Sequence, residues 1–253
     1  MTDFIAAQDR ALLEQHGLAS FDALWALQLE AVDEPNTERG GWSSVYRLEL
    51  GEAAFYLKRQ SNHLARSLLR PFGEPTFTRE FRNIQRFQAL AIPALEAAFF
   101  AERRVAGERR AILLTRALDG WCDLDSLLPN WQSRPQSERA AILRACAKLA
   151  KRLHAAGQLH GCFYPKHIFL KEEGLKEGCV SFQARLIDLE KIRPLLFGER
   201  ERIKDLEPLL RRASVWSEVE VRELLTAYLP EGDDIAHWLQ RLGARRNNKD
   251  ARR

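Results

Sequence analysis

The N-terminal half of the chain changes from a helical to an alternating pattern of hydrophobic positions. Residues 3–16 and 21–29 place their apolar side chains at helical spacing. Residues 42–50 and 53–59 then alternate apolar with polar side chains on either side of the turn at Gly51, which predicts a β-hairpin. Helices therefore precede a sheet.

One helix interrupts the strands that follow. Residues 76–90 carry apolar side chains at intervals of three, and further strands are predicted over 97–101 and 110–115. Residues 61–77 are rich in arginine, glycine and proline, so we expect a basic loop there. The pattern predicts an antiparallel sheet with one inserted helix.

The second half of the chain is mainly helical. Its longest predicted helix, over 137–156, carries an alanine-rich apolar stripe and ends at Gly157. A loop and short strand over 160–171 and a strand over 184–187 follow, joined by a charged turn. Three closing helices are expected over residues 200–212, 218–228 and 234–242.

Composition adds little to this picture beyond exclusions. The net charge of +4 arises from 39 basic and 35 acidic residues, so we expect no nucleic-acid partner. No apolar run approaches the roughly 20 residues that span a bilayer, and the N-terminus is too charged for a signal peptide. The four cysteines form no Cys-x-x-Cys pair, which favours a reducing compartment. We expect a cytoplasmic protein.

Arginines gather at two places in the N-terminal half. Arg66 and Arg70 lie in the predicted basic loop, and a second cluster contains Arg103, Arg104, Arg109 and Arg110. One interpretation is that they face an anionic sugar-phosphate or a lipid surface, which would give peripheral contact with a membrane. The other is that they are solvated surface charge.

Three features of the same half are candidates for phosphate chemistry. Gly40 and Gly41 lie in a turn where backbone can approach a phosphate, and Lys58 lies on the following hairpin strand. Glu80 in the inserted helix is a candidate acidic partner for Lys58. The alternatives are a surface hairpin, a solvated lysine and a glutamate that suits a helix N-terminus.

Two runs in the second half carry the most specific signal. Residues 160–170 are His-Gly-Cys-Phe-Tyr-Pro-Lys-His-Ile-Phe-Leu, and residues 186–190 are Leu-Ile-Asp-Leu-Glu. With Lys-Asp-Leu at 204–206, they resemble the lipopolysaccharide kinase family of the InaA/WaaP type, and the InaA branch in particular. Related members carry His-Arg-Asp-x-Tyr-x-x-His-Phe-Leu. The resemblance spans residues 30–210.

This resemblance implies a protein-kinase-like bilobal α+β fold and predicts four segments. They are an N-terminal helical extension (1–30), a kinase-like N-lobe with an antiparallel sheet (31–118), a mainly helical C-lobe with the catalytic loop (119–243) and a disordered basic tail (244–253). The implied activity is transfer of phosphate from ATP, with Mg²⁺, to a heptose of the lipopolysaccharide inner core at the cytosolic face of the inner membrane.

The resemblance also implies roles for individual residues. Lys58 would bind the nucleotide phosphates with Glu80 as its ion-pair partner, and Gly40 and Gly41 would lie over them. Asp188 would hold Mg²⁺. His167 occupies the position where ordinary kinases have a metal-binding asparagine, so it is a second candidate metal ligand.

Cys162 departs from the family pattern because it stands where the catalytic aspartate is expected. Gly161 likewise replaces the usual arginine. His160 is either part of the catalytic loop's chemistry or purely structural. Lys166 and Tyr164 lie in the same loop, but neither is an obvious substitute for a carboxylate base.

Three functions remain open. The first is a sugar kinase in which Cys162 or another group replaces the base. The second is a pseudokinase that binds nucleotide but transfers phosphate poorly, because general-base assistance is typically worth about 10²–10⁴-fold in rate. The third is a small-molecule kinase outside lipopolysaccharide metabolism, because a fold does not fix the acceptor.

Overall fold

A computed structural model describes residues 3–37, 40–67, 70–176 and 179–250 of the chain. It divides into two compact units, of which the first contains residues 1–89 and 95–119 and the second contains residues 90–94 and 120–253. The mixed helix and antiparallel-sheet architecture confirms the predicted α+β class.

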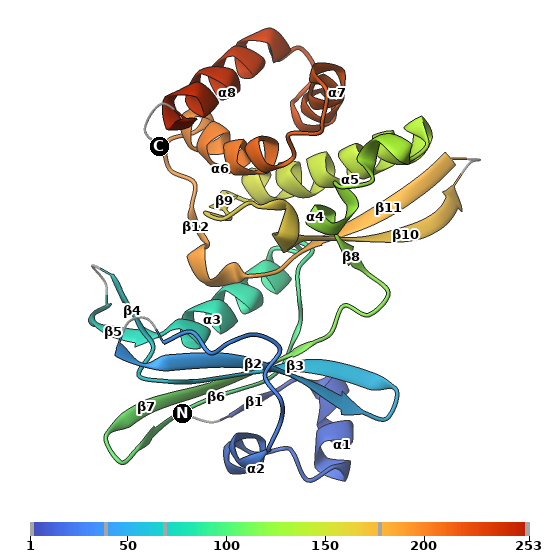
Figure 1. Cartoon of the computed structure of the whole chain (residues 1–253). Coiled ribbons are helices and arrows are strands. Elements are labelled where there is room, and N and C mark those ends of the chain that lie inside the picture. The colour runs from blue at the N-terminus through green and yellow to red at the C-terminus, as the bar shows by residue number, and fades with distance from the viewer. Residues whose placement is uncertain (1–2, 38–39, 68–69, 177–178, 251–253) are drawn as a thin grey trace. The chain divides into compact units, whose positions relative to one another are not determined.

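The first unit is built on a five-stranded antiparallel sheet of order β1-β6-β7-β3-β2. Helices α1 and α2 pack on one face of the sheet, and α3 packs on the other (Figure 1). The strands are β1 (Phe4–Ile5), β2 (Trp42–Leu50), β3 (Ala53–Ser61), β6 (Ala97–Val105) and β7 (Glu108–Arg116). The helices are α1 (Ala7–Gln15), α2 (Phe21–Ala26) and α3 (Thr76–Ala89).

Side-chain alternation explains why this sheet is covered on both faces. Phe55 and Leu57 of β3 point into a core shared with Leu13 and Leu24 of the first two helices, and all four are fully buried. Lys58 and Gln60 lie on the opposite face of β3 and contact α3. The predicted inserted helix at 76–90 is confirmed by α3.

Two predictions for the first unit were wrong. The expected loop at 61–77 contains two paired strands, β4 (Leu64–Ser67) and β5 (Arg70–Pro75), because backbone pairing occurs there without an alternating apolar pattern. Residues 68–69 of that loop lie outside the described part. The predicted helix at 3–16 begins only at Ala7, because Phe4 and Ile5 pair with Phe100 and Phe99 of β6.

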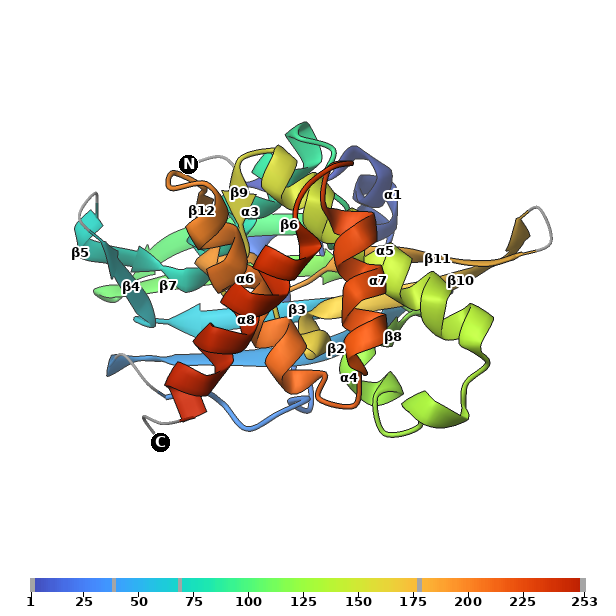
Figure 2. The ribbon, with the colours of Figure 1, turned by 90° about the horizontal axis from the view of Figure 1, so that it is seen from above.

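The second unit packs a helical layer against a long hairpin. In Figure 2, α7 lies beside α5, and α6 lies beside α8. The helices are α4 (Leu124–Leu127), α5 (Gln136–Ala155), α6 (Glu199–Arg212), α7 (Glu218–Tyr228) and α8 (Ile235–Asp250), with 3-10 turns η2 (Trp131–Ser133), η3 (Pro165–His167) and η4 (Leu189–Lys191). The strands are β8 (Cys122–Asp123), β9 (Gln158–Leu159), β10 (Ile168–Lys176), β11 (Cys179–Leu186) and β12 (Arg193–Pro194).

Helices α6, α7 and α8 confirm the three closing helices that the hydrophobic periodicity predicts. Two other segments of this unit differ from expectation. The predicted charged turn at 172–178 is largely strand, with a bulge where Gly174 has a φ of 84°. Residues 177–178 of that turn lie outside the described part. Helix α8 continues to Asp250, so residues 244–250 of the expected basic tail are helical. Residues 251–253 are not described.

None of the helices in the described ranges has the length and apolar character needed to cross a bilayer.

The closest backbone approach in the first unit occurs at Gly41. A Cβ atom there would lie 2.2 Å from the Ser61 carbonyl oxygen and 2.5 Å from the His63 amide nitrogen. Both are backbone atoms and cannot rotate away, so only glycine fits this position.

We therefore expect Gly41→Ala to lower the free energy of unfolding by about 2–3 kcal/mol, as overpacking does. Urea denaturation measures this change. The control is Gly243→Ala in α8, where a Cβ meets no neighbour within 4 Å, and which should be neutral or stabilising by up to about 1 kcal/mol. Similar stability of the two variants would contradict this packing.

Candidate functional site

Lys58 points toward α3 because its neighbours along β3 point the other way. Arg59 donates from Nη1 to the carbonyl oxygens of Trp25 and Leu27, at 2.7 and 2.8 Å, on the α2 side of the sheet. The Lys58 Nζ consequently lies 2.6 Å from Glu80 Oε1 in α3. The side chains are 18% and 4% exposed, so the predicted partnership of Lys58 with Glu80 is a largely buried ion pair.

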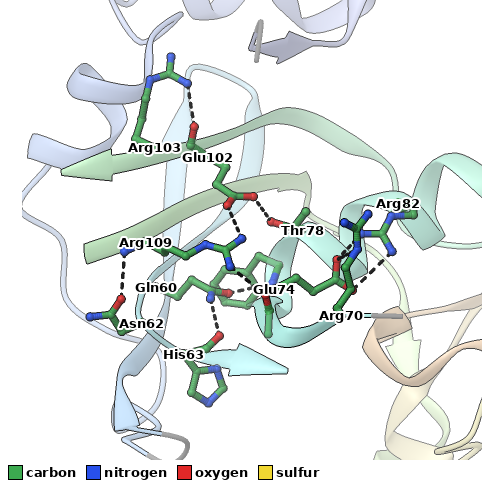
Figure 3. Close-up of polar contacts among 12 residues, drawn as sticks. Gln60, Asn62, His63, Arg70, Glu74, Thr78, Arg82, Glu102, Arg103 and Arg109 are labelled. Carbon is green, nitrogen blue, oxygen red and sulfur yellow. Dashed lines mark hydrogen bonds and ion pairs between the residues drawn. The ribbon is translucent and has the colours of Figure 1, made fainter. Parts of the chain in front are cut away.

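The same strand also fixes the start of the helix that carries Glu80. Gln60 is fully buried, and its Oε1 accepts hydrogen bonds from the Thr76 hydroxyl and the Phe77 amide, both at 2.8 Å. Its Nε2 donates to the His63 carbonyl oxygen at 2.6 Å (Figure 3). Gln60 satisfies one of the free amides of the first turn of α3 and holds the helix over β3.

Gly40 and Gly41 lie in the turn before β2. Gly40 has a φ of 76°, and Gly41 packs against the backbone of residues 61–63. This close approach accounts for Gly41 without a ligand. Contact of either glycine with phosphate stays a prediction.

In the second unit, one buried carboxylate holds the loop that begins at His160. Asp205 of α6 accepts hydrogen bonds from the backbone amides of His160 at 2.8 Å and Gly161 at 2.7 Å, one on each carboxylate oxygen. Gly161 has a φ of 76°, and a Cβ there would lie 2.7 Å from the Lys191 carbonyl oxygen. The glycine at this position therefore has a steric cause.

A chain of hydrogen bonds orients Asp205. His154 of α5 lies 3.2 Å from the carboxylate through Nε2 and 2.7 Å from the Tyr228 hydroxyl through Nδ1. Burial raises the pKa of Tyr228, so its hydroxyl stays protonated and donates to His154. Burial alone would raise the pKa of Asp205, but hydrogen bonds from His154 and from the loop amides outweigh it, and the net pKa is lowered.

His160 joins the two sequence runs. Its side chain is fully buried, and its Nε2 lies 3.0 Å from the Ile187 carbonyl oxygen. Burial lowers the pKa of His160, so the ring is neutral and Nε2 donates to that carbonyl. These contacts support the structural interpretation of His160; a direct catalytic role stays a prediction.

His167 and Asp188 face each other, and each presents one acceptor atom to the other. The Nδ1 of His167 lies 2.8 Å from the Cys162 carbonyl oxygen, which can only accept, so Nδ1 carries the proton. Burial lowers the pKa of His167, which leaves the ring neutral and Nε2 with a free lone pair. This Nε2 lies 3.4 Å from Asp188 Oδ2.

Two acceptors at this distance fit a shared cation. Carboxylate oxygen and neutral imidazole nitrogen are both ordinary metal ligands, and the hydrogen bond on Nδ1 is the outer contact that usually orients such a histidine. Within the described ranges, no cluster of three or more His, Cys, Asp or Glu side chains forms a metal site. Magnesium is commonly held by one or two carboxylates together with substrate phosphates, so Asp188 supplies the type of ligand that it prefers and His167 would add a nitrogen.

Asp188 also has an unusual backbone. Its φ of 56° and ψ of 63° lie in the left-handed region, which costs a non-glycine residue roughly 1–2 kcal/mol. The amide of Ile187 donates to the His167 carbonyl oxygen at 3.1 Å, which fixes the backbone immediately before Asp188. Such strain is typical of functional sites.

Cys162 lies at the expected position of the catalytic aspartate and is buried. The pKa of Lys191 is raised, chiefly by its electrostatic interaction with Cys162. Lys166 is exposed in η3. The ring of Tyr164 lies under the Arg212 guanidinium at 3.9 Å.

Sequence reasoning left three functional residues out of the candidate site. Gln60 gave no signal beyond its place on the strand of Lys58. Asp205 gave one, because a carboxylate among Ile203, Leu206 and Leu209 lies on the buried face of its helix. Lys191 is brought to Cys162 only by the turn after Asp188.

The architecture is that of a protein-kinase-like fold. The solved structure described as WaaP in complex with acyl carrier protein matches with a TM-score of 0.72 and 20% identity, over 98% of this chain and 99% of that chain. Residues 22–228 match the lipopolysaccharide kinase (Kdo/WaaP) family. Protein InaA of Escherichia coli (strain K12) is 32% identical over 209 residues, which are 79% of this chain and 93% of InaA. The chain belongs to the lipopolysaccharide kinase (Kdo/WaaP) family, which confirms the resemblance.

We expect Asp205→Asn to lower the free energy of unfolding by about 2–3 kcal/mol. The amide NH₂ would face a buried donor, and at least one loop amide would lose its partner. Urea denaturation measures the loss, with the exposed Asp125→Asn as control, which should change stability by less than about 0.5 kcal/mol. Equal effects would show that Asp205 does not anchor the loop.

The contacts of Glu201 with the segment that follows Asp188 should make the stability of the fold depend on pH. Glu201 pairs with Arg193 and accepts from the amides of Leu196 and Phe197, at 2.7 and 2.8 Å. Burial alone would raise the pKa of Glu201, but these partners lower it from 4.5 to about 2.

Because this folded-state pKa lies below the unfolded one, the stabilisation is complete above 4.5 and disappears as the pH falls toward about 2. Melting temperatures compared at about pH 6 and about pH 3 should therefore fall less for Glu201→Gln than for the wild type. A variant that loses the same amount would disprove this linkage.

Proposed function

We propose that this protein is an ATP- and Mg²⁺-dependent kinase that phosphorylates a heptose of the lipopolysaccharide inner core. The observation that carries the proposal is the facing pair of His167 Nε2 and Asp188 Oδ2, 3.4 Å apart, on a loop anchored by Asp205. Membership of the lipopolysaccharide kinase family supports the class of acceptor.

Each unit contributes one part of the proposed chemistry. Lys58, held by Glu80, would bind nucleotide phosphates, and its buried partner keeps the ammonium in one place. Asp188 and His167 would hold Mg²⁺, which when bound neutralises phosphate charge. Phosphoryl transfer depends on such positioning and charge more than on covalent help from the protein.

Proton transfer is the step that the site supports least. Cys162 offers a thiol beside the Lys191 ammonium where a carboxylate is expected. This observation favours the alternative function, a pseudokinase that binds nucleotide and transfers phosphate slowly. Loss of a general base costs typically about 10²–10⁴-fold in rate.

The acceptor also suggests a location. An inner-core substrate attached to lipid is met at a membrane surface, so we place the protein in the cytoplasm with peripheral contact at the inner membrane. No nucleic acid is required.

Nucleotide binding tests the site before any acceptor is chosen. We expect ATP with Mg²⁺ to raise the melting temperature of the wild type, because ligand that binds only the folded state stabilises it. Asp188→Ala should lose the Mg²⁺-dependent part of the rise, whereas the exposed Asp125→Ala should keep it. A wild type that does not respond, or a full response in Asp188→Ala, would reject the assignment.

Phosphate transfer to dephosphorylated core oligosaccharide separates the two functions. If Cys162 is the base, Cys162→Ala should lose about 10²-fold or more in kcat, with little change in nucleotide affinity. Cys162→Asp should retain or increase transfer, because Lys191 can pair with the new carboxylate. Transfer seen only in Cys162→Asp would identify a pseudokinase, and full transfer by Cys162→Ala would exclude the thiol as base.

A further inference from the structure

A groove of about 1110 Å³ in the first unit lies apart from the residues assigned above. Its walls come from α3, from β5 and from the arginine-rich ends of β6 and β7. The two arginine clusters seen in the sequence meet here, since Arg70 comes from the first cluster and Arg103, Arg104 and Arg109 come from the second.

The groove has an aromatic floor. Phe81 of α3 stacks on Phe100 of β6 with ring centroids 4.3 Å apart, and Phe4 of β1 contacts Phe81 at 4.9 Å. Phe72 of β5 also lines the groove and is 90% exposed. Phe100 is buried and Phe81 is half-buried, so the accessible aromatic surface comes mainly from Phe72, and such surface is typical of sites that receive an apolar group.

The walls carry an excess of positive charge. Five arginines and two glutamates line the groove, but the Arg103 guanidinium lies over the Phe21 ring of α2, on the other face of the sheet, and pairs with Asp3 at 2.5 Å. Along β6 and β7, Arg103 lies opposite Arg110, and Arg104 lies opposite Arg109. Like charges in directly opposed positions destabilise a sheet, and acidic partners offset this for three of the four, because Arg103 pairs with Asp3, Arg110 with Glu108 and Arg109 with Glu102.

The chain fixes several of these arginines without neutralising the groove. Glu102 accepts from Arg109 at 2.9 Å and from the Thr78 hydroxyl at 2.8 Å, and Glu74 pairs with Arg82 of α3. Arg109 also donates to the Gly73 carbonyl oxygen at 2.8 Å. Arg104 is exposed and forms no ion pair with any side chain in the described ranges.

We propose that this groove docks an acidic segment of a partner protein, with an aromatic or aliphatic anchor residue flanked by carboxylates. Guanidinium groups bind carboxylates in a bidentate geometry, and arginine with aromatic residues forms the centre of many protein interfaces. The volume is at the upper end for a single small molecule. A flat lipid surface would leave the recessed Phe81–Phe100 floor empty.

An occupant would contact the helix of the Lys58–Glu80 ion pair. Thr78, Phe81 and Arg82 line the groove on either side of Glu80 in α3. Binding would therefore restrain the turn that carries Glu80. The docking itself requires neither nucleotide nor phosphate transfer, so it can be tested separately from the proposed function.

The test is a selection of displayed random peptides on the full-length protein, followed by fluorescence polarisation with a synthesised winner. We expect enriched peptides to carry aspartate or glutamate around an apolar residue. Arg104→Glu should weaken binding by about tenfold or more, because it reverses a charge at the interface. Arg86→Glu is the matched control, since Arg86 is exposed on the same α3 but does not line the groove, and it should change the affinity less than about twofold.

Several outcomes would overturn the proposal. They are enrichment of peptides without acidic residues, equal loss of binding in both variants, and failure to select any binder. Vesicles containing phosphatidylglycerol form a second arm. Vesicle binding that is lost in Arg104→Glu, without peptide binding, would show that the groove faces a membrane. The melting temperature of each variant must match the wild type, and Arg104→Gln replaces Arg104→Glu if the latter is unstable.

Discussion

The second unit depends on the placement of one buried carboxylate. Asp205 receives two backbone amides of the loop at 160–161 and one histidine of α5, so a single side chain ties α6 to α5 and to the loop. With that end of the loop fixed, His160 reaches the Ile187 carbonyl oxygen and His167 turns its free nitrogen toward Asp188. An interior charge is costly unless it is fully hydrogen-bonded, and here it is.

In the first unit, the side chain that fixes a helix in place is the neutral Gln60. Lys58 and Gln60 lie two residues apart on the same face of β3, and they hold α3 at two places. Gln60 bonds the first turn, and Lys58 meets Glu80 one turn further along. The geometry of the ion pair is therefore set by the alternation of β3, whose other face is fixed in the core by Phe55, Leu57 and Arg59.

Strong periodicity was the reliable part of the sequence. The alternation of β2 and β3 and the apolar faces of α3, α5, α6 and α7 predicted those elements, and the Lys58–Glu80 pair followed from their order. The β4–β5 hairpin and strand β1 were missed because backbone pairing across the chain, not a local pattern, creates them.

The candidate site was likewise predictable only where a local sequence pattern marks its residues. Motif residues such as His167 and Asp188 were identified by their position in two runs, whereas Gln60 and Lys191 act through contacts that only the folded chain creates. The glycines at 41 and 161 show a further limit of sequence patterns. Each was considered as part of a ligand-binding or catalytic motif, and each is explained by a carbonyl oxygen that leaves no space for a Cβ.

The central claim is that His167 Nε2 and Asp188 together bind a divalent cation. The most direct measurement is electron spin-echo envelope modulation of Mn²⁺ bound with ADP, which detects nitrogen coordinated to the metal. We predict imidazole nitrogen modulation in the wild type that disappears in His167→Asn while Mn²⁺ stays bound. Bound Mn²⁺ without this modulation in the wild type, or unchanged modulation in His167→Asn, would contradict the account.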